Sequence, residues 1–301
     1  MIQFSLGIPV YNEGQNIGRL LQSVANSQFR FCQIGEIIVI ASGCTDNTKE
    51  VVANFSKSEP RIRLVEEPSR LGKASAVNLL LTESRFEVVV MCCGDLILET
   101  ETLERLVAPF ADLEVGLTGA HPEPLNNKQS FLGFSAHLLW QLHHLISLES
   151  PKTVELIAFR KVFKRIPLLS ATDEANIEPL VRGQAYKYLY IPKALVYNLG
   201  PQTLGELIDQ RRRIFAGHLA VKREQSYEVS TLNPFRILRI LLKLSIIRLA
   251  SGKGVPIRYV LWTISLVGLE GYCRVLGWGD YFLIKKKLNI WAIASSTKKI
   301  L

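Results

Sequence analysis

The first hundred residues alternate between short apolar segments and longer segments in which apolar residues recur with helical spacing. The apolar segments at 2–10, 36–40, 62–65 and 87–93 predict strands, and the segments at 16–27, 45–57 and 73–81 predict helices. Strands that alternate with helices of this length indicate βαβ units. We therefore expect an α/β fold with a doubly wound, mostly parallel sheet.

The middle of the chain is less regular. Apolar spacing predicts helices at 135–148, 174–181 and 203–220, and short apolar runs predict strands at 155–159 and 186–191. The sequence contains no internal repeat and no low-complexity linker. We assign these elements to the same domain as the first hundred residues.

Polar, glycine-containing loops follow the predicted strands of the first half: YNEGQN, ASGCTDN, EPSRLGK and CGD. In open α/β sheets, ligands bind beyond the carboxyl ends of the strands, which share one edge. Asp95, at the end of the stretch EVVVMCCGDL, is the first candidate for contact with a charged ligand or its metal. A turn aspartate that caps the following helix would have the same sequence.

The loop after the first predicted strand contains several groups suited to a nucleotide. Pro9 fixes the backbone where the strand ends, and Tyr11 offers a flat face for stacking on a base. Asn12 and Glu13 bring polar atoms to the same edge. An ordinary turn and helix start would explain Asn12 and Glu13 equally well.

Two further loops precede predicted helices. Thr45 or Asp46 can cap the helix that follows in SGCTDNT. Gly72 and Lys73 open the helix at 73–81 after Arg70, so backbone N–H groups and two cations converge where a diphosphate could lie. Helix N-termini with nearby cations are common, so this pattern alone is weak.

Asp173 and Glu174 form an acidic pair in TDEANI. Paired carboxylates can raise the pKa of one member toward the range that a general base needs. Helix capping by Thr172 or Asp173 is the simpler alternative. Further along, Gln210, Arg212 and Arg213 offer donors that would bind a pyrophosphate, or a solvated basic helix face.

The C-terminal third carries the excess of positive charge. Residues 1–200 contain 19 Lys/Arg and 21 Asp/Glu, whereas residues 201–301 contain 17 and 6. The segment NPFRILRILLKLSIIRLAS predicts a basic amphipathic helix of the kind that lies at a membrane interface. The apolar segment 259–269 is too short to span a bilayer, so we expect an in-plane or half-buried helix.

Lys285–Lys287 with Trp291 add the cations and aromatic residue that are typical of interfaces. A buried core helix with solvated lysines is the alternative for this whole region. The five cysteines are an odd number, with Cys92 and Cys93 adjacent, which indicates a reducing cytoplasm and no disulfide framework.

The ordered set IPVYNE (8–13), SGCTDNT (42–48), LGKASAVN (71–78), GD (94–95), TDE (172–174) and QRRRI (210–214) resembles the family 2 glycosyltransferases of the GT-A fold over residues 1–220. This resemblance implies an inverting enzyme that uses a nucleotide sugar. It implies that IPVYNE holds the base and ribose, that Asp46, Arg70 and Lys73 lie near the donor, and that Gln210, Arg212 and Arg213 belong to the Q-x-x-R-W region.

The resemblance also implies a divalent metal, Mg²⁺ or Mn²⁺, held by Asp95 next to Gly94, and a general base at Glu174 with Asp173 beside it. The sequence departs from the family at three positions. Cys93 stands where the first carboxylate of D-x-D is expected, Ala41 where an aspartate usually contacts the base, and Ile214 where a tryptophan follows the arginine. The first two departures weaken the metal and nucleotide assignments.

We therefore expect a GT-A domain at 1–220, with a nucleotide-sugar-binding half at 1–98 and an acceptor half at 99–220, and a basic, apolar, helical membrane-associated region at 221–301. The expected partners are a nucleotide-sugar donor, a lipid or lipid-linked acceptor and an anionic membrane surface, with no nucleic acid. The expected location is the cytoplasmic side of the membrane, as a peripheral or monotopic protein. The alternatives are an enzyme of polysaccharide synthesis with a non-lipid acceptor, a nucleotidyltransferase, and a non-enzymatic basic module that binds membrane or nucleic acid.

Overall fold

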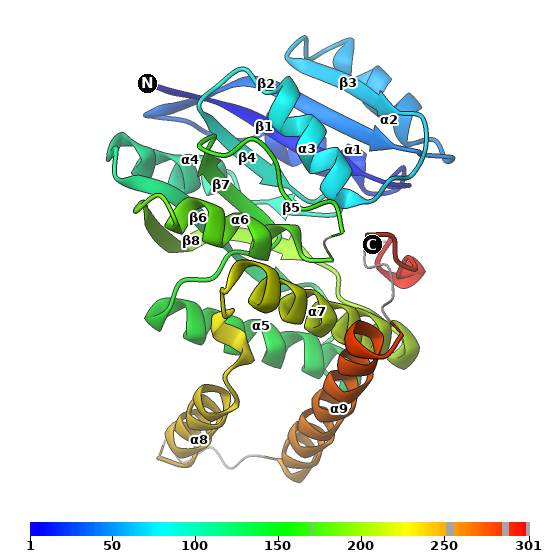
Figure 1. Ribbon diagram of the computed structural model, residues 1–301, viewed down its shortest axis with the longest axis vertical. Coiled ribbons are helices and arrows are strands. Elements are labelled where there is room, and N and C mark those ends of the chain that lie inside the picture. The colour runs from blue at the N-terminus through cyan, green and yellow to red at the C-terminus, as the bar shows by residue number, and fades with distance from the viewer. Residues whose placement is uncertain (170, 251–255, 285–288, 299–301) are drawn as a thin grey trace.

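A computed structural model describes residues 1–301 except 170, 251–255, 285–288 and 299–301, and it describes the backbone alone for 244–250. Its described strands form one sheet in the order β3-β2-β1-β4-β7-β6-β8-β5. Figure 1 shows this sheet at one end of the molecule and two helices that project from the other end.

The first half of the sheet is parallel, as the sequence predicts. It contains β1 (Ile2–Val10), β2 (Cys32–Ser42), β3 (Ile62–Glu67) and β4 (Val88–Cys92), and the intervening helices are α1 (Ile17–Ala25), α2 (Thr48–Ser56) and α3 (Lys73–Glu83). β1 pairs in parallel with both β2 and β4, and β2 with β3. The carboxyl ends of these strands therefore share one edge.

The second half makes the sheet mixed. β7 (Leu156–Arg160) pairs antiparallel with β4 and with β6 (Val115–Pro124), while β8 (Lys187–Asn198) is parallel to β6 and antiparallel to β5 (Ile97–Leu98). The sequence did not predict β5 or β6. The helices of this half are α4 (Thr102–Val107), α5 (Phe131–Glu149) and α6 (Asp173–Arg182).

Both faces of the central strands are buried. Along β4, Val88 and Val90 pack into the core on one face, whereas Val89 and Met91 pack into the core on the other. A strand covered on both sides reads as a continuous apolar run, which is why the stretch before Gly94 contains no polar residue between Glu87 and Cys92. The sheet thus provides a rigid support for the loops at its edge.

The C-terminal part contains α7 (Leu204–Gln225), α8 (Pro234–Ala250) and α9 (Ile257–Phe282). The helix that contains the apolar segment 259–269 is longer than expected, because α9 continues through Glu270 to Phe282. Arg211 of α7 neutralises Glu270, which allows the helix to keep a carboxylate within it. Among the described residues, α9 alone is long and apolar enough to cross a membrane by length and composition.

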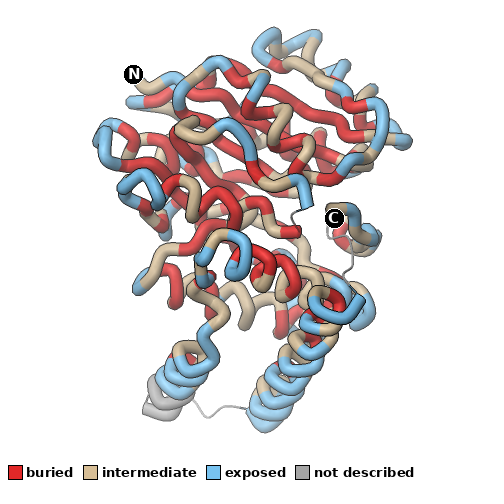
Figure 2. The backbone as a smooth tube through the Cα atoms, viewed as in Figure 1, coloured by how far each residue is buried: buried red, intermediate tan, exposed pale blue. Residues whose placement is uncertain are grey.

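One side of α9 packs on α7 and the other side is exposed, as Figure 2 shows. The exposed apolar side chains of α9 include Leu261, Ile264, Val267 and Val275. α8 packs on α5 through Ile240, and it exposes Phe235, Leu238 and Leu242. The two helices thus present apolar surface at the end of the molecule opposite the sheet.

After α9 the chain returns to the sheet. Residues 289–298, which we call the C-terminal segment, include the short 3-10 helix η3 (Ser295–Lys298) and lie near α3 and the carboxyl ends of the strands (Figure 1). Trp291 is half-buried there, against Arg213 of α7, so its assignment to a membrane interface is wrong. Lys285–Lys287 lie outside the described residues.

Candidate active site

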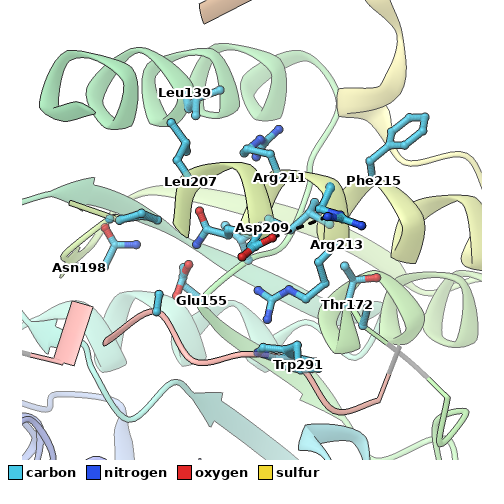
Figure 3. A pocket seen from close by; sticks show the side chains of 18 of the residues that line it. Leu139, Glu155, Thr172, Asn198, Leu207, Asp209, Arg211, Arg213, Phe215 and Trp291 are labelled. Atoms are coloured by element: carbon cyan, nitrogen blue, oxygen red, sulfur yellow. Dashed lines mark ion pairs between the residues drawn. The ribbon is translucent and has the colours of Figure 1, made fainter. Parts of the chain in front are cut away.

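A cavity of about 860 Å³ opens at the carboxyl ends of β1 and β4 and extends under α7 toward α5, α8 and α9. Figure 3 shows the part of its wall between α5, α7 and the C-terminal segment. Most of the candidate residues from the sequence line this one cavity: Pro9, Tyr11, Glu13, Arg70, Lys73, Gly94, Asp95, Asp173, Glu174, Gln210, Arg212 and Arg213.

Asn12 and Asp46 are not part of the cavity wall. The side chain of Asn12 accepts a hydrogen bond from the backbone N–H of Thr45 at 2.8 Å and donates to its hydroxyl at 3.1 Å. Asp46 accepts hydrogen bonds from the N–H groups of Gly14 and Thr48, both at 3.0 Å. These bonds lower the pKa of Asp46 in spite of the opposing effect of burial. Both residues therefore join the loop after β1 to the loop after β2.

Asp95 lies in a group with Cys93 and Glu155, whose ligand atoms are all within 4.8 Å of one another. Mg²⁺ and Mn²⁺ prefer oxygen ligands, and two carboxylates that converge with a third donor fit such an ion. Burial, followed by the nearby charge of Asp95, raises the pKa of Glu155 to about 7. Burial also raises the pKa of the Cys93 thiol, so this side chain is a weaker ligand than the expected carboxylate.

Glu155 reaches this group because β7 runs antiparallel to β4. The residue before an antiparallel strand lies at the same edge as the residue after its partner, and Cys93 N–H donates to Glu155 O at 3.2 Å. Glu155 has a φ of 59°, a backbone angle that is costly for a residue with a side chain. Such strain persists where the surrounding structure fixes it, often at functional sites.

Gly94 allows the loop after β4 to pass close to the loop after β1. A Cβ atom at this position would lie 2.6 Å from Val10 Cγ1 and 3.0 Å from Glu13 Cγ. Glu13 is buried next to Asp95. Its burial and the charge of Asp95 raise its pKa to about 7, although the ammonium of Lys298 acts in the opposite direction. The first and fourth strands thus bring two carboxylates together.

Lys73 connects the two halves of the cavity. Its ammonium donates a hydrogen bond to Glu174 Oε1 at 2.7 Å, lies 4.0 Å from Asp173 Oδ2 and is 3.4 Å from Cys93 Sγ. Lys73 begins α3, whereas the acidic pair begins α6. A cation predicted for the diphosphate and the candidate base are therefore in direct contact.

The two carboxyl groups of the pair have different environments. Burial raises the pKa of Asp173 to about 7, and the Oδ1 atom of Asp173 is buried without a hydrogen-bond partner in the described part of the chain. Burial also acts on Glu174, but the charge and hydrogen bond of Lys73 outweigh it and lower its pKa. Glu174 is therefore ionised at neutral pH, the form that a general base requires.

Three arginines in and near the Q-x-x-R-W region have different roles. Arg212 donates two hydrogen bonds to the carboxylate of Asp280 in α9, at 2.8 and 2.6 Å. This carboxylate takes two of the five N–H donors of Arg212 and ties the guanidinium to α9, so Arg213 is the better candidate for a diphosphate ligand. Arg211 is paired with Glu270. These two pairs fix α9 on α7.

Arg213 instead points into the cavity, with its guanidinium carbon 4.2 Å from the ring centroid of Trp291 (Figure 3). It makes no hydrogen bond or ion pair with any residue that the structure describes, and its Nε atom is buried. Burial lowers its pKa to about 10, although the nearby Asp173 and Glu174 act in the opposite direction. Arg213 is thus a cation with free donors in the cavity wall.

Arg70 contacts both Tyr11 and Trp291. Its guanidinium carbon is 4.1 Å from the ring centroid of Tyr11, so it covers one face of the ring proposed for base stacking. It also donates to the carbonyl oxygen of Trp291 at 2.7 Å. Lys298, from the same C-terminal segment, forms an ion pair with Glu13 and donates to Tyr11 O at 3.4 Å.

The far end of the cavity is apolar. It is lined by side chains of α5, α8 and α9: Leu138, Leu139, Leu142, Ile146, Ile237, Leu238, Leu241, Leu266 and Val267. Lys152, which is 4% exposed, also lines the cavity and makes no hydrogen bond or ion pair with the described residues. Its ammonium therefore offers a positive charge in the cavity wall to an anionic ligand.

The sequence reasoning missed Glu155, Trp291, Lys298 and Lys152. Glu155 had a weak signal, because it directly precedes an apolar strand, but its position depends on an antiparallel pairing. Trp291 and Lys298 are more than 200 residues from the loops that they contact. No local pattern would have indicated these contacts.

Comparisons with known proteins agree with the fold and the motifs. Residues 5–140 match the model of the family described as Glycosyl transferase family 2. The dolichyl-phosphate beta-glucosyltransferase ALG5C of Trichomonas vaginalis is 33% identical over 149 residues, which cover 44% of each chain. The poly-beta-1,6-N-acetyl-D-glucosamine synthase of Staphylococcus epidermidis is 25% identical over 71% of this chain and 54% of its own length. The chain thus matches about half or less of these relatives.

Among solved structures, a mannosyltransferase from Pyrobaculum calidifontis in complex with GDP-Man and Mn²⁺ has a TM-score of 0.66 and 19% identity, over 94% of this chain and 88% of its own. A glucosyl-3-phosphoglycerate synthase from Mycobacterium tuberculosis in complex with Mn²⁺ and UDP-glucose has a TM-score of 0.52 and 17% identity, over 73% and 78%. These similarities establish the GT-A fold. With this fold, the donor half of the chain, residues 5–140, matches glycosyl transferase family 2.

Proposed function

We propose that the protein is an inverting glycosyltransferase that moves a sugar from a nucleoside diphosphate to a lipid or lipid-linked acceptor at the cytoplasmic face of a membrane. One observation carries this proposal. A single cavity joins a polar end, with carboxylates and cations at the edge of the sheet, to an apolar end between α5, α8 and α9. A donor with a charged leaving group suits the first end, and an acceptor with an acyl or prenyl chain suits the second.

The donor would bind at the loops after β1 and β4. Pro9, Tyr11 and Glu13 would line the base and ribose end, while Arg70, Lys73 and Arg213 would face the diphosphate and Gln210 would lie nearby. The free donors of Arg213 support this assignment, because guanidinium groups bind phosphate oxygens in pairs. Arg70 would have to share the face of Tyr11 with the base or move from it.

Asp95 and Glu155 would hold Mg²⁺ or Mn²⁺ next to Gly94, with Cys93 adjacent. Such an ion supplies positive charge that stabilises the departing diphosphate. The residues of this chain contribute its oxygen ligands, and Lys73 and Arg213 add further positive charge nearby. Mn²⁺ occurs with the nucleotide sugar in both structural neighbours described above, which supports the same requirement here.

Glu174 would accept the proton of an acceptor hydroxyl, with Asp173 as its neighbour. The acceptor oxygen would form a bond to the anomeric carbon as the bond from that carbon to the diphosphate breaks, so one displacement inverts the configuration. In the free protein Glu174 is held ionised by Lys73. An incoming diphosphate would compete for Lys73 and thereby release the Glu174 carboxylate for proton transfer.

The apolar end of the cavity supports a lipid acceptor. Leu238, Leu241 and Val267 line it, and Leu238 and Val267 are also among the exposed side chains of α8 and α9. A chain held between these helices would therefore pass from the membrane-facing surface to the cavity. Lys152 supports an acceptor with an anionic group, as in the dolichyl-phosphate glucosyltransferase to which the chain is similar.

The exposed apolar faces of α8 and α9, and the net charge of +11 over 201–301, support attachment to an anionic membrane. The five free cysteines are consistent with the cytoplasmic side. Polysaccharide synthesis with a non-lipid acceptor is the second candidate, favoured by the similarity to the Staphylococcus synthase. The apolar lining of the cavity makes it the weaker one.

Partition of the product tests the choice between these functions. Full-length protein in lipid vesicles is supplied with Mn²⁺, a radiolabelled nucleotide sugar and a membrane lipid extract, and the product is divided between organic and aqueous phases. We expect label in the organic phase, with loss of this signal in Leu241→Glu and retention in Leu113→Glu, whose side chain is exposed at the surface away from the cavity wall. Label only in an aqueous polymer would identify the second candidate.

A further inference from the structure

The C-terminal segment forms part of the wall of the donor end of the cavity. Residues 289–294, Thr297 and Lys298 line it together with the loops after β1 and β4. The segment follows α9, the helix with the exposed apolar face, and it is separated by more than 200 residues from the loops that it contacts. It therefore links the membrane-facing part of the chain to the donor site.

Contacts at both ends hold the segment in place. Asn289 donates to Leu71 O at 3.4 Å, and a Cβ atom on Gly72 would lie 2.3 Å from Asn289 O. Gly72 has a φ of 101°, which favours glycine independently of this contact. At the other end, Ser296 N–H donates to Glu206 Oε1 at 3.0 Å, and Lys298 pairs with Glu13.

Trp291 lies between two cations of the donor site. Its carbonyl oxygen accepts from Arg70 Nη2 at 2.7 Å, and its ring faces the guanidinium of Arg213 at 4.2 Å. For Arg213 this ring is the principal support, since the guanidinium has no hydrogen bond or ion pair with the described residues. Ring stacking fixes the plane of a guanidinium but leaves its N–H groups available.

We propose that Trp291 is a positioning residue that holds Arg70 and Arg213 in the cavity wall so that their free N–H groups bind the diphosphate of the donor. This inference rests on the proposed function. The sequence motif around Arg213 has Ile214 where a tryptophan was expected, so the aromatic partner of this arginine comes from a distant part of the chain. The donor site is complete only when the C-terminal segment is in place.

The test uses full-length protein and distinguishes the effect of the aromatic ring of Trp291 from the effect of its volume. Trp291→Leu keeps apolar volume without a π face, and Trp291→Phe keeps a ring. We expect Trp291→Leu to weaken nucleoside diphosphate binding and raise KM for the donor by about tenfold, the range of a desolvated cation–π contact. The Phe variant should restore binding to within about threefold of wild type. KM for the acceptor should change little in either variant.

A double-mutant cycle shows whether Trp291 acts through Arg213. If it does, the loss of diphosphate affinity in Trp291→Leu combined with Arg213→Ala will be clearly smaller than the product of the two single losses. Diphosphate binding should also change the tryptophan fluorescence of the wild type, and Trp291→Phe should abolish this change. Trp278→Phe, in α9 and outside the cavity wall, is the matched control and should retain it.

Two results would overturn the inference while leaving the proposed function intact: wild-type diphosphate affinity in Trp291→Leu, or full independence of the two substitutions in the cycle. Equal losses in the Leu and Phe variants would also overturn it, because the ring would then have no role. Failure of the wild type to bind any of UDP, GDP or dTDP with Mn²⁺ would instead reject the proposed function.

Discussion

Lys73 Nζ lies 2.7 Å from Glu174 Oε1, although the two residues belong to different halves of the fold. Lys73 begins the helix that follows β3, and Glu174 lies in the first turn of α6. The contact connects a cation at the donor end with the candidate base. Donor binding and base activation are therefore expected to depend on each other.

Replacement of Lys73 by Met should remove the hydrogen bond and the positive charge beside Glu174. The Lys73 charge lowers the pKa of Glu174, and without it burial would raise that pKa above the ordinary value. We expect kcat to fall by roughly 10- to 100-fold, the range for loss of a charge-assisted hydrogen bond. The acid limb of the kcat/KM profile should also move to higher pH. A pH profile of kcat/KM from pH 5 to 9 checks this, and an unchanged limb in the variant would contradict it.

The identity of the base follows from the same profile in the wild type. Because its pKa is lowered in the free protein, Glu174 is ionised throughout the neutral range, so kcat/KM should be nearly flat from pH 6 to 8. Asp173, with a pKa of about 7, would instead give a rate that rises through pH 7. Glu174→Gln should abolish transfer to a hydroxyl acceptor, whereas Asp173→Asn should retain part of it. The opposite order would assign the base to Asp173.

Asp173 should also make stability depend on pH. Its pKa is about 7 in the folded protein and near 3.8 when unfolded, so the folded state retains a proton that the unfolded state loses. The free energy of unfolding should therefore decrease as pH rises from about 4 to 7 and level off above that. Asp173→Asn should reduce this slope by up to about 1.4 kcal/mol per pH unit.

Denaturant unfolding at several pH values measures the effect. Glu13 and Glu155 also have raised pKa values and contribute in the same direction, so the variant should retain a shallower slope. Glu224→Gln, at an exposed position in α7, is the control for removal of a carboxyl group. A slope that is identical in wild type and Asp173→Asn would exclude the raised pKa.

Cys93→Asp should strengthen metal binding. The substitution places a carboxylate where the Cys93 thiol, with a pKa raised by burial, now stands next to Asp95 and Glu155. Hard divalent cations prefer oxygen to sulfur. We expect Mn²⁺ to bind about tenfold more tightly, as measured by electron paramagnetic resonance of free Mn²⁺. Asp95→Asn should bind less Mn²⁺ than wild type. Equal Mn²⁺ affinity in the three proteins would contradict the assignment of a metal to this site.

Membrane attachment should depend on the exposed face of α9. Ile264 is 65% exposed, and a charge at this position would oppose insertion into lipid. We expect Ile264→Glu combined with Leu261→Glu to reduce flotation with anionic liposomes by at least about tenfold. Leu113→Glu, which replaces an even more exposed leucine outside α9, should float like wild type. Point substitutions are preferable to truncation, because removal of α9 would leave Arg211 and Arg212 without their partners.

The sequence predicted the donor half well because the elements there are local. Each strand from β1 to β4 contains a short, mostly apolar run, and the loops that follow are more polar. Parallel pairing then brings Tyr11 and Asp95 to one edge without further information. The acidic pair at Asp173 also lies near this edge, in contact with Lys73, and only the resemblance to a family gave it a role.

The parts that the sequence did not predict depend on long-range contacts. Glu155 joins Asp95 only because β7 is antiparallel to β4, and the apolar run 155–159 does not reveal the direction of its strand. The length of α9 was underestimated because Glu270 was treated as the end of an apolar segment, whereas Arg211 neutralises it. Trp291 was assigned to the membrane surface from its neighbours in sequence, while its contacts are with Arg70 and Arg213.

A donor screen tests the central claim most directly. Full-length protein in lipid vesicles with Mn²⁺ is incubated with UDP, GDP and dTDP sugars, and release of the nucleoside diphosphate is measured for wild type, Asp95→Ala and Glu174→Gln. We predict turnover of sugars on one of these nucleotides by the wild type, and a loss of at least about 100-fold in both variants. Wild-type protein that releases no diphosphate from any donor, or variants that are as active as the wild type, would contradict a glycosyltransferase site at this cavity.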